Sequence, residues 1–259
     1  MNAPVAPMPV LYFESVSRTF QQGGKQTVHA LVEVSFGVHP QEIVAVIGPS
    51  GAGKTTLANI ALGLDRPTGG TLRWGGDDVR KLRRGALRQA KRANRLVTQD
   101  PFGALHPGMT VFEVVSEPLR GSALDRAAWA PTVNSALESV GLDPSAYGRR
   151  YPHQLSGGQR QRVAVARATV GAPRLIVADE PTSMLDVSVR ASINSLLRNI
   201  RDERAVGILL ITHDLGIARY IADRVVVLDG GRVVESGPAD QVFSQPEAPM
   251  TRALINAAL

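Results

Sequence analysis

Residues 42–56 read EIVAVIGPSGAGKTT. The run Ile43–Ile47 is entirely apolar, and most of its side chains are β-branched. Such a run is typical of a strand that is buried on both faces of a parallel sheet. It stops at a cluster of glycines, after which apolar side chains recur at helical spacing in KTTLANIALGL. The stretch therefore predicts a buried strand, a tight turn and a helix, in that order.

The turn satisfies the pattern G-x-x-x-x-G-K-[ST]. Glycines let successive backbone N–H groups converge on a phosphate, and the N-terminus of the following helix adds partial positive charge. Lys54 can reach the β- and γ-phosphates, and the Thr55 hydroxyl can ligate Mg²⁺. An ordinary glycine-rich turn with an exposed lysine is the alternative. We expect a nucleoside triphosphate to bind at Gly48, Pro49, Ser50, Gly51, Ala52, Gly53, Lys54, Thr55 and Thr56.

Two further apolar runs, RLIVAD (174–179) and GILLIT (207–212), predict two more buried strands. Helical patterns lie between and after them, which favours a mostly parallel sheet covered by helices on both faces. The other segments predict antiparallel strands over 10–37 around the turn QQGGK, a helical insertion over 101–167, helices around 187–201 and 215–222, a hairpin over 224–237 and a terminal helix over 249–259.

The composition limits the class of protein. The length of 259 residues suits one medium domain, or one domain carrying a smaller subdomain. Hydrophobic residues make up 44% and charged residues 20%, which allows a packed core and rules out global disorder. The sequence contains no cysteine, which excludes disulfides, thiolate metal sites and a cysteine nucleophile. No apolar run approaches the roughly 20 residues that a membrane-spanning helix needs.

The formal net charge is +6, and a strongly basic segment, RKLRRGALRQAKRANR, covers residues 80–95. Such a segment could approach anionic lipid or a nucleic acid. A solvated helix face is the simpler interpretation, because runs of charge are usually solvated. We therefore expect no nucleic-acid partner.

The strand predicted over 174–179 ends in two adjacent carboxylates, Asp179 and Glu180. Beside a phosphate-binding loop, Asp179 can hold Mg²⁺ directly or through water. Glu180 then points past the metal, where it could orient or deprotonate an attacking water. A solvated strand exit is the alternative for this Asp-Glu-Pro sequence.

A second glycine-rich turn, LSGGQ, precedes a predicted helix over Gln159–Val170. Ser156 is suited to be the N-cap of that helix, and Gly157 and Gly158 leave N–H groups open to an anion. The sequence thus predicts two helix N-termini that could bind an anion. Taken alone, an SGG tripeptide could equally be a simple turn.

Together these motifs resemble the ATP-binding cassette (ABC) family, over residues 11 to about 238. The motifs stand in the family's order: GPSGAGKTT, the loop VTQDP with Gln99, LSGGQRQR, LIVADEPTS, the LD pair that ends at Asp186, and ITHD with His213. The resemblance implies an α/β fold with a P-loop NTPase (RecA-like) core, a mostly parallel sheet, an N-terminal antiparallel β subdomain and an inserted α-helical subdomain. The implied ATP-binding domain covers 10–238, with the core at 10–98 and 168–238, the helical subdomain at about 99–167 and a short tail at 239–259.

The resemblance also implies that two cassettes dimerise head to tail. The LSGGQ turn of one subunit would then contact the ATP held by the phosphate loop of the other. Asp186 would act across the dimer interface. The residues implied to contact ATP in this way are Ser156, Gly157, Gly158 and Gln159.

Within one cassette, the resemblance implies that Glu180 is the catalytic base. His213 would contact the γ-phosphate and hold Glu180 in place, and Gln99 would touch Mg²⁺ and the attacking water. Phe20 would stack on adenine, with an ordinary strand aromatic as the alternative. The residues implied to hold the metal are Thr55, Gln99 and Asp179.

Three positions depart from the family's usual pattern. Phe20 stands where tyrosine is more frequent, Thr98 replaces an aromatic residue, and Met184 lies where a small residue is usual, which questions the packing of its loop. None of these changes removes a catalytic group. We therefore expect a competent ATPase that uses ATP and Mg²⁺.

Three stretches, 98–111, 149–168 and 236–259, look like the oligopeptide, dipeptide and nickel importer branch of the family. This resemblance implies a subunit that energises the import of peptides or nickel and other metal chelates, peripherally bound at the cytoplasmic face of the membrane. Its partners would be a second cassette, either a different chain or a second copy, two transmembrane permeases and, indirectly, a solute-binding protein. The alternative is a soluble ABC ATPase in a non-transport assembly, such as iron–sulfur assembly or a phosphonate-degradation scaffold.

Overall fold

A six-stranded sheet organises the chain. A computed structural model describes residues 7–22 and 26–258, and the strands of this sheet follow the order β10-β9-β3-β8-β7-β6. The neighbours from β9 to β6 pair in parallel, and β10 is antiparallel to β9. The strands are β3 (Ile43–Ile47), β6 (Asn94–Val97), β7 (Leu175–Asp179), β8 (Gly207–Ile211), β9 (Arg224–Asp229) and β10 (Arg232–Pro238).

A second, antiparallel sheet of four strands has the order β2-β1-β4-β5. Its first two strands confirm the antiparallel pair predicted over 10–37. The expected turn between them includes residues 23–25, which lie outside the described part of the chain. The strands are β1 (Leu11–Gln22), β2 (Gln26–Val38), β4 (Gly69–Trp74) and β5 (Asp77–Asp78).

Alternate residues of the parallel strands face two different hydrophobic cores. In β3, Ile43 and Ile47 face the core that contains α8 (Val187–Arg204), and Val44 faces the core that contains α1 (Lys54–Ala61) and the antiparallel sheet. Both faces of the strand are covered, which explains why its sequence is apolar without alternation.

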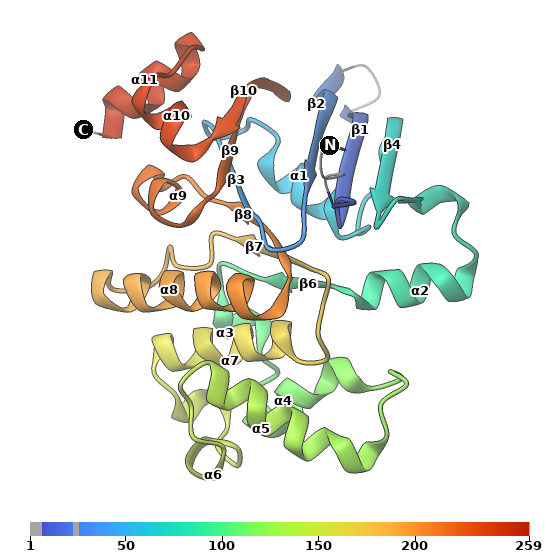
Figure 1. Cartoon of the computed structure of the whole chain (residues 1–259), viewed down its shortest axis with the longest axis vertical. Coiled ribbons are helices and arrows are strands. Elements are labelled where there is room, and N and C mark those ends of the chain that lie inside the picture. The colour runs from blue at the N-terminus through green and yellow to red at the C-terminus, as the bar shows by residue number, and fades with distance from the viewer. Residues whose placement is uncertain (1–6, 23–25, 259) are drawn as a thin grey trace, which may run out of the picture.

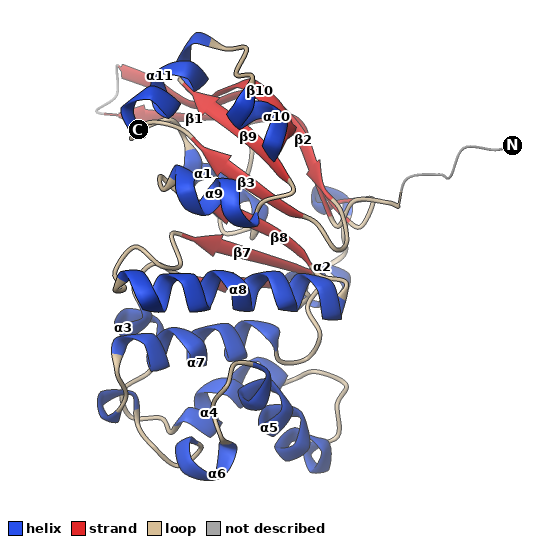
Figure 2. Ribbon diagram, turned by 60° about the vertical axis from the view of Figure 1, so that its left-hand side comes forward, coloured by secondary structure: helices blue, strands red, loops and turns tan. Residues whose placement is uncertain are grey.

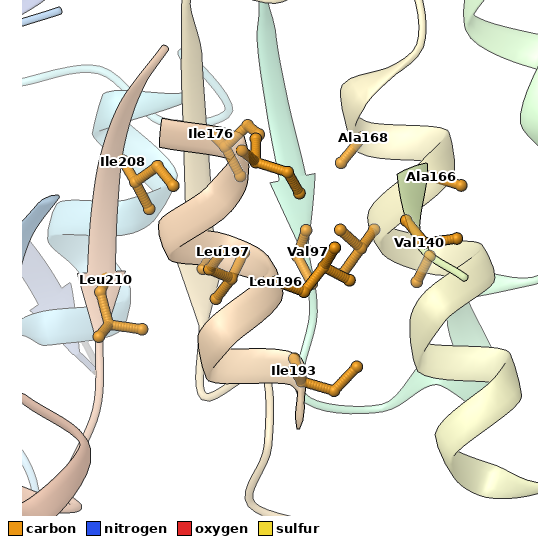
Figure 3. Packing of buried hydrophobic residues seen from close by; sticks show 14 of the residues in the cluster. Val97, Val140, Ala166, Ala168, Ile176, Ile193, Leu196, Leu197, Ile208 and Leu210 are labelled. Carbon is orange, nitrogen blue, oxygen red and sulfur yellow. The ribbon is translucent and has the colours of Figure 1, made fainter. Parts of the chain in front are cut away.

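The chain between β6 and β7 folds into the expected helical layer (Figure 1). Figure 2 shows α8 lying between β7 and α7, with α4 and α5 beyond α7. The apolar side chains that join α7 and α8 to β6, among them Val97, Ala168 and Leu196, are seen in Figure 3. The helices of the layer are α3 (Pro101–Ala104), α4 (Val111–Ser116), α5 (Trp129–Ser139), α6 (Pro144–Tyr147) and α7 (Gly157–Thr169).

One predicted boundary is wrong. We expected the helix after LSGGQ to begin at Gln159, but α7 begins at Gly157, because Ser156 caps it and both glycines already have helical geometry. The proposed division into a core at 10–98 and 168–238, a helical subdomain at about 99–167 and a tail at 239–259 stays a prediction.

A hairpin and several short helices complete the described part of the chain. The predicted hairpin is formed by β9 and β10, and the terminal helix is anchored by Glu235, whose carboxylate accepts hydrogen bonds from the backbone N–H groups of Glu247 and Ala248. Every helix in the described residues is too short or too polar to cross a membrane. These helices are α2 (Arg84–Arg92), α9 (Leu215–Ile221), α10 (Ala239–Ser244) and α11 (Pro249–Ala258).

Candidate nucleotide-binding site

The glycine-rich loop lies between β3 and α1, as predicted. Gly48 and Gly53 have φ angles of 154° and 101°. A Cβ atom at Gly48 would lie 2.1 Å from the carbonyl oxygen of Leu228, and one at Gly53 would lie 2.3 Å from that of Ala30. Glycine is therefore required at both positions. The loop is pressed against β9 on one side and β2 on the other, which fixes its path before α1 begins.

Lys54 points back across this loop. Its Nζ atom donates hydrogen bonds to the carbonyl oxygens of Gly48, at 2.7 Å, and Pro49, at 2.9 Å. Burial lowers the pKa of the Lys54 ammonium, and the nearby carboxylates of Glu180 and Asp179 act in the opposite direction. The lysine therefore links the loop after β3 to the end of β7 electrostatically.

Asp179 and Glu180 follow each other at the end of β7. Burial raises the pKa of the Asp179 carboxyl, Glu180 raises it further, and Lys54 opposes both. Glu180 has a left-handed φ of 46°, which is uncommon for a residue with a side chain, and its N–H donates to the carbonyl oxygen of Ile211 at 2.8 Å. Backbone strain of this kind clusters at functional sites.

The imidazole of His213 meets the carboxylate of Glu180. His213 follows the end of β8, the neighbour of β7, by two residues. Its Nδ1 atom lies 2.8 Å from Oε1 of Glu180. The Glu180 side chain is 21% exposed and that of His213 is 64% exposed. The histidine therefore fixes one carboxylate oxygen and keeps much of its own ring open to a ligand.

Three other predicted residues lie on neighbouring elements. Gln99 follows β6 by two residues, and because β6 is parallel to β7, it leaves the sheet at the edge where Asp179 lies. Thr55 is the second residue of α1. Phe20 belongs to β1 in the other sheet, and the guanidinium carbon of Arg18 lies 4.3 Å from its ring centroid. The sheet order thus gathers the loops after β3, β6, β7 and β8 at one edge, whereas Phe20 comes from the antiparallel sheet.

The LSGGQ turn caps α7 and does not join this group. The Oγ atom of Ser156 accepts a hydrogen bond from the N–H of Gln159 at 3.2 Å, and Oε1 of Gln159 accepts one from the N–H of Ser156 at 2.9 Å. A Cβ atom at Gly158 would lie 2.7 Å from Cγ1 of Val189, so glycine lets α7 and α8 approach closely. The hydrogen bonds of the described residues hold this turn to its own helix and to Tyr147, not to the phosphate loop.

Asp186 stands directly before α8, and its side chain does not cap the helix. Met184, which replaces the small residue usual in the family, is 60% exposed and so does not crowd its loop. Arg190 was not among the predicted site residues; its Nε atom donates to the carbonyl oxygen of Leu185 at 2.7 Å. Its position one helical turn after Asp186 is the signal that could have identified it.

Comparison with known proteins decides the family. A family model described as "ABC transporter" matches residues 31–183, more than half of the chain. The chain belongs to the ABC transporter family. It is 40% identical over 243 residues to the di/tripeptide transport ATP-binding protein DppF of Pseudomonas aeruginosa (strain UCBPP-PA14), covering 93% of this chain and 75% of that protein. It is also 37% identical over 251 residues to the putative oligopeptide transport ATP-binding protein YkfD of Bacillus subtilis (strain 168), covering 96% and 76%.

Solved ABC cassettes share the fold of this ABC chain. A dimeric cassette in a post-hydrolysis state, bound to ADP and phosphate, aligns with a TM-score of 0.76 and 30% identity over 88% of this chain and 98% of that one. CbiO1 from Clostridium perfringens, part of an ABC transporter complex, aligns with a TM-score of 0.82 and 26% identity over 97% and 99%. These likenesses confirm the predicted α/β cassette fold and the predicted activity: the chain is an ATP-binding ABC ATPase.

Proposed function

We propose that this chain is the ATP-hydrolysing subunit of an importer for short peptides and that it binds peripherally at the cytoplasmic face of the membrane. The relatives at 37% and 40% identity are named for oligopeptide and di/tripeptide transport, and those from Brucella for peptide import. These names favour peptides over nickel chelates as cargo. They also favour a transport complex over the alternative of a non-transport assembly.

The proposal for hydrolysis rests on the contact between His213 and Glu180. This contact lies near Lys54, which follows the glycine-rich loop. Glu180 takes a proton from a water molecule whose oxygen attacks the γ-phosphorus, and the bond from that phosphorus to its bridging oxygen breaks, which yields ADP and phosphate. His213 keeps the Glu180 carboxylate oriented, and the rest of its ring is exposed and so open to contact with the γ-phosphate. Lys54 neutralises charge on the phosphates.

The same edge offers Mg²⁺ a suitable donor set. Mg²⁺ takes oxygen ligands, usually one or two carboxylates together with substrate phosphates and waters. The carboxylate of Asp179, the hydroxyl of Thr55 and the amide oxygen of Gln99 are such donors. Burial already disfavours the charged form of Asp179, which is the condition that a bound cation relieves. When bound, Mg²⁺ would offset the negative charge of the phosphates.

The LSGGQ turn serves a second cassette in this proposal. N–H groups in the first turn of a helix have no partner within the helix and are suited to bind an anion. In the part of the chain that the structure describes, the N–H groups of Gly157 and Gly158 donate no hydrogen bond to the phosphate loop of their own chain. We assign them to the γ-phosphate of ATP held by a partner cassette, with Asp186 at the interface. The dimeric cassette among the solved relatives supports this arrangement.

A basic groove supports the permease partnership. It has a volume of about 800 Å³ and lies between α2, β6 and α7, beside Thr98 of the Gln99 loop. In the described residues, the side-chain nitrogen of Asn94 and Nε of Arg95 are buried donors without a partner, which points to a partner that brings acceptor oxygens. We propose that an acidic cytoplasmic segment of a permease docks there. The groove's charged lining has one acid, Glu117, against the bases Arg84, Arg88, Lys91, Arg92, Arg95, Arg120 and Arg167.

The test of the importer role uses the assembled complex. The tagged full chain is purified from its own membranes in mild detergent, and the complex is placed in liposomes with its solute-binding protein. We expect ATP hydrolysis and uptake of labelled di- to oligopeptides to rise together, and both to be lost with Glu180→Gln. Stimulation by a nickel chelate and not by peptides, or purification without any membrane protein, would contradict the proposal.

The docking groove is tested separately. The charge reversal Arg88→Glu should reduce the amount of permease that is retained with the chain. The control Arg219→Glu changes a basic residue on α9, which does not line the groove. Equal retention of the permeases by both variants would rule out the groove as the docking site.

A further inference from the structure

Arg190 on α8 joins two loops. The first runs from Glu180 to Asp186, between β7 and α8, and the second runs from Thr212 to Asp214, between β8 and α9. Its Nε atom donates to the carbonyl oxygen of Leu185 at 2.7 Å, and Nη2 donates to that of Ser183 at 3.3 Å. Its third nitrogen, Nη1, lies 3.8 Å from Oδ2 of Asp214. One guanidinium thus holds the backbone of the first loop with two donors and faces the carboxylate of the second with another.

Asp214 is itself held firmly. Its Oδ1 atom accepts a hydrogen bond from the N–H of Ile217 at 3.0 Å and so caps α9, and its own N–H donates to Oγ1 of Thr212 at 3.0 Å. The second oxygen of the same carboxylate therefore meets Arg190 in a defined place. Because Asp214 directly follows His213, whatever fixes Asp214 also limits the movement of the histidine.

The two loops are consequently joined at two points. The first is the hydrogen bond of 2.8 Å between Glu180 and His213, and the second is Arg190. A single contact would let one loop rotate against the other, whereas two contacts define their relative orientation. The first of these loops ends at Asp186, the residue that we place at the dimer interface.

The position of Arg190 is not explained by stability alone. It is the fourth residue of α8, where the positive end of the helix dipole disfavours a cation. Its side chain and that of Asp214 are both about one-third exposed, and ion pairs of this kind contribute little to the free energy of unfolding. The planar fork of an arginine, however, can serve two carbonyl groups and a carboxylate together, which a lysine cannot.

We infer that Arg190 is a positioning residue that ties the loop ending at Asp186 to the loop carrying His213, so that docking of the partner cassette sets the geometry of Glu180 for hydrolysis. This inference rests on the proposed roles of Glu180 and Asp186. Arg190 itself is not assigned a contact with nucleotide or water. It acts through the two loops that it holds.

The experiment compares Arg190→Gln with the matched control Arg198→Gln in the assembled transport complex. Arg198 lies two turns further along α8 and packs on the ring of Tyr220, away from both loops. We expect Arg190→Gln to lower kcat for ATP hydrolysis about 5- to 30-fold, the range of couplings that act through geometry. KM for ATP, the Kd of a fluorescent ATP analogue and Tm should stay close to wild type. Arg190→Lys, which keeps the charge, should recover part of kcat.

A second pair of variants keeps the test decisive if Arg190→Gln folds poorly. Asp214→Asn retains the cap of α9 and loses the charge, so it should lower kcat less than Arg190→Gln does. Combined with Arg190→Gln, it should add less than about a 2-fold loss, because both changes break the same link. Losses that multiply, an unchanged kcat in Arg190→Gln, or an equal loss in Arg198→Gln would each overturn the inference.

Failure of the inference can be told apart from failure of the proposed function. If Glu180→Gln abolishes hydrolysis and Arg190→Gln leaves kcat unchanged, only the positioning role is wrong. If Glu180→Gln hydrolyses ATP at the wild-type rate, the assignment of the base is wrong, and the role of Arg190 fails with it.

Discussion

The Nδ1 atom of His213 and the Oε1 atom of Glu180 lie 2.8 Å apart, although 33 positions separate the two residues in the chain. Each residue follows the end of a parallel strand, and these strands, β7 and β8, are neighbours in the sheet. The pairing of the strands therefore creates the contact. Neither helical periodicity nor a local turn pattern in the sequence could have predicted this contact.

Glu180→Gln should abolish hydrolysis and preserve nucleotide binding. The amide has nearly the shape of the carboxylate but cannot accept the proton of the attacking water, so kcat should fall at least about 100-fold. Phosphate release measures the loss, and a fluorescent ATP analogue measures binding. Glu203→Gln, on the exposed end of α8, is the matched control and should behave as wild type. Hydrolysis at more than a tenth of the wild-type rate in Glu180→Gln would assign the base to another group.

Asp179→Asn should stabilise the chain near neutral pH when no nucleotide is added. Burial and Glu180 raise the pKa of Asp179 above its value in the unfolded chain, so its contribution to stability is fully present below the unfolded pKa and is lost as the pH rises through the folded pKa. Removing the charge should raise Tm, and each 1 kcal/mol gained corresponds to about 2–4 °C in a chain of this size.

The increase in Tm caused by Asp179→Asn should become smaller as the pH falls through the raised pKa of Asp179, because the wild-type carboxyl is then neutral as well. Thermal unfolding over a range of pH tests both points. Asp77→Asn, at an exposed position of β5, should leave Tm unchanged. A lower Tm for Asp179→Asn near neutral pH would show that attraction to Lys54 outweighs burial.

Phe20→Ala should weaken the binding of ATP and ADP by the same factor, because the two nucleotides share the adenine ring. Stacking of a base on an aromatic side chain contributes about 1–3 kcal/mol to the binding free energy. Phe20→Tyr keeps the ring and should bind within about 2-fold of wild type on that account. Titration with both nucleotides provides the measurement. Unchanged affinity in Phe20→Ala would remove this residue from the site.

Gly158→Ala should destabilise the packing of α7 on α8. The added Cβ atom would lie 2.7 Å from Cγ1 of Val189, a stiff, β-branched side chain. Overpacking of this kind costs about 1–3 kcal/mol of the free energy of unfolding, measured by chemical denaturation. The double variant Gly158→Ala/Val189→Ala makes room for the new methyl group and should recover most of the loss. A double variant that is no more stable than Gly158→Ala would locate the strain elsewhere.

The sequence alone predicted the elements whose hydrophobic pattern is strong. β3, β7 and β8 are continuously apolar because both of their faces are buried, and this pattern is local. β4 and β6 were not predicted, because β4 begins with two glycines, which weaken strand propensity, and β6 is a short strand that begins at the polar Asn94. The start of α7 was misplaced because the cap at Ser156 outweighs the low helix propensity of the glycines after it.

The motifs identified which residues could bind a nucleotide, but not how these residues affect one another. The left-handed backbone of Glu180 and the raised pKa of Asp179 depend on burial and on strands far apart in the chain. The link through Arg190 likewise requires the loops after β7 and β8 to be adjacent. Such features become visible only when the sheet order is known.

The presence of two separate hydrophobic cores on opposite faces of the large sheet has a mechanical consequence. α1, which follows the phosphate loop, shares one core with the antiparallel sheet, and α8 shares the other with the helical layer. A tilt of the helical layer therefore repacks one face and leaves the other intact. The helical layer can therefore move relative to the sheet, while α1 and the glycine-rich loop before it keep their packing against the antiparallel sheet.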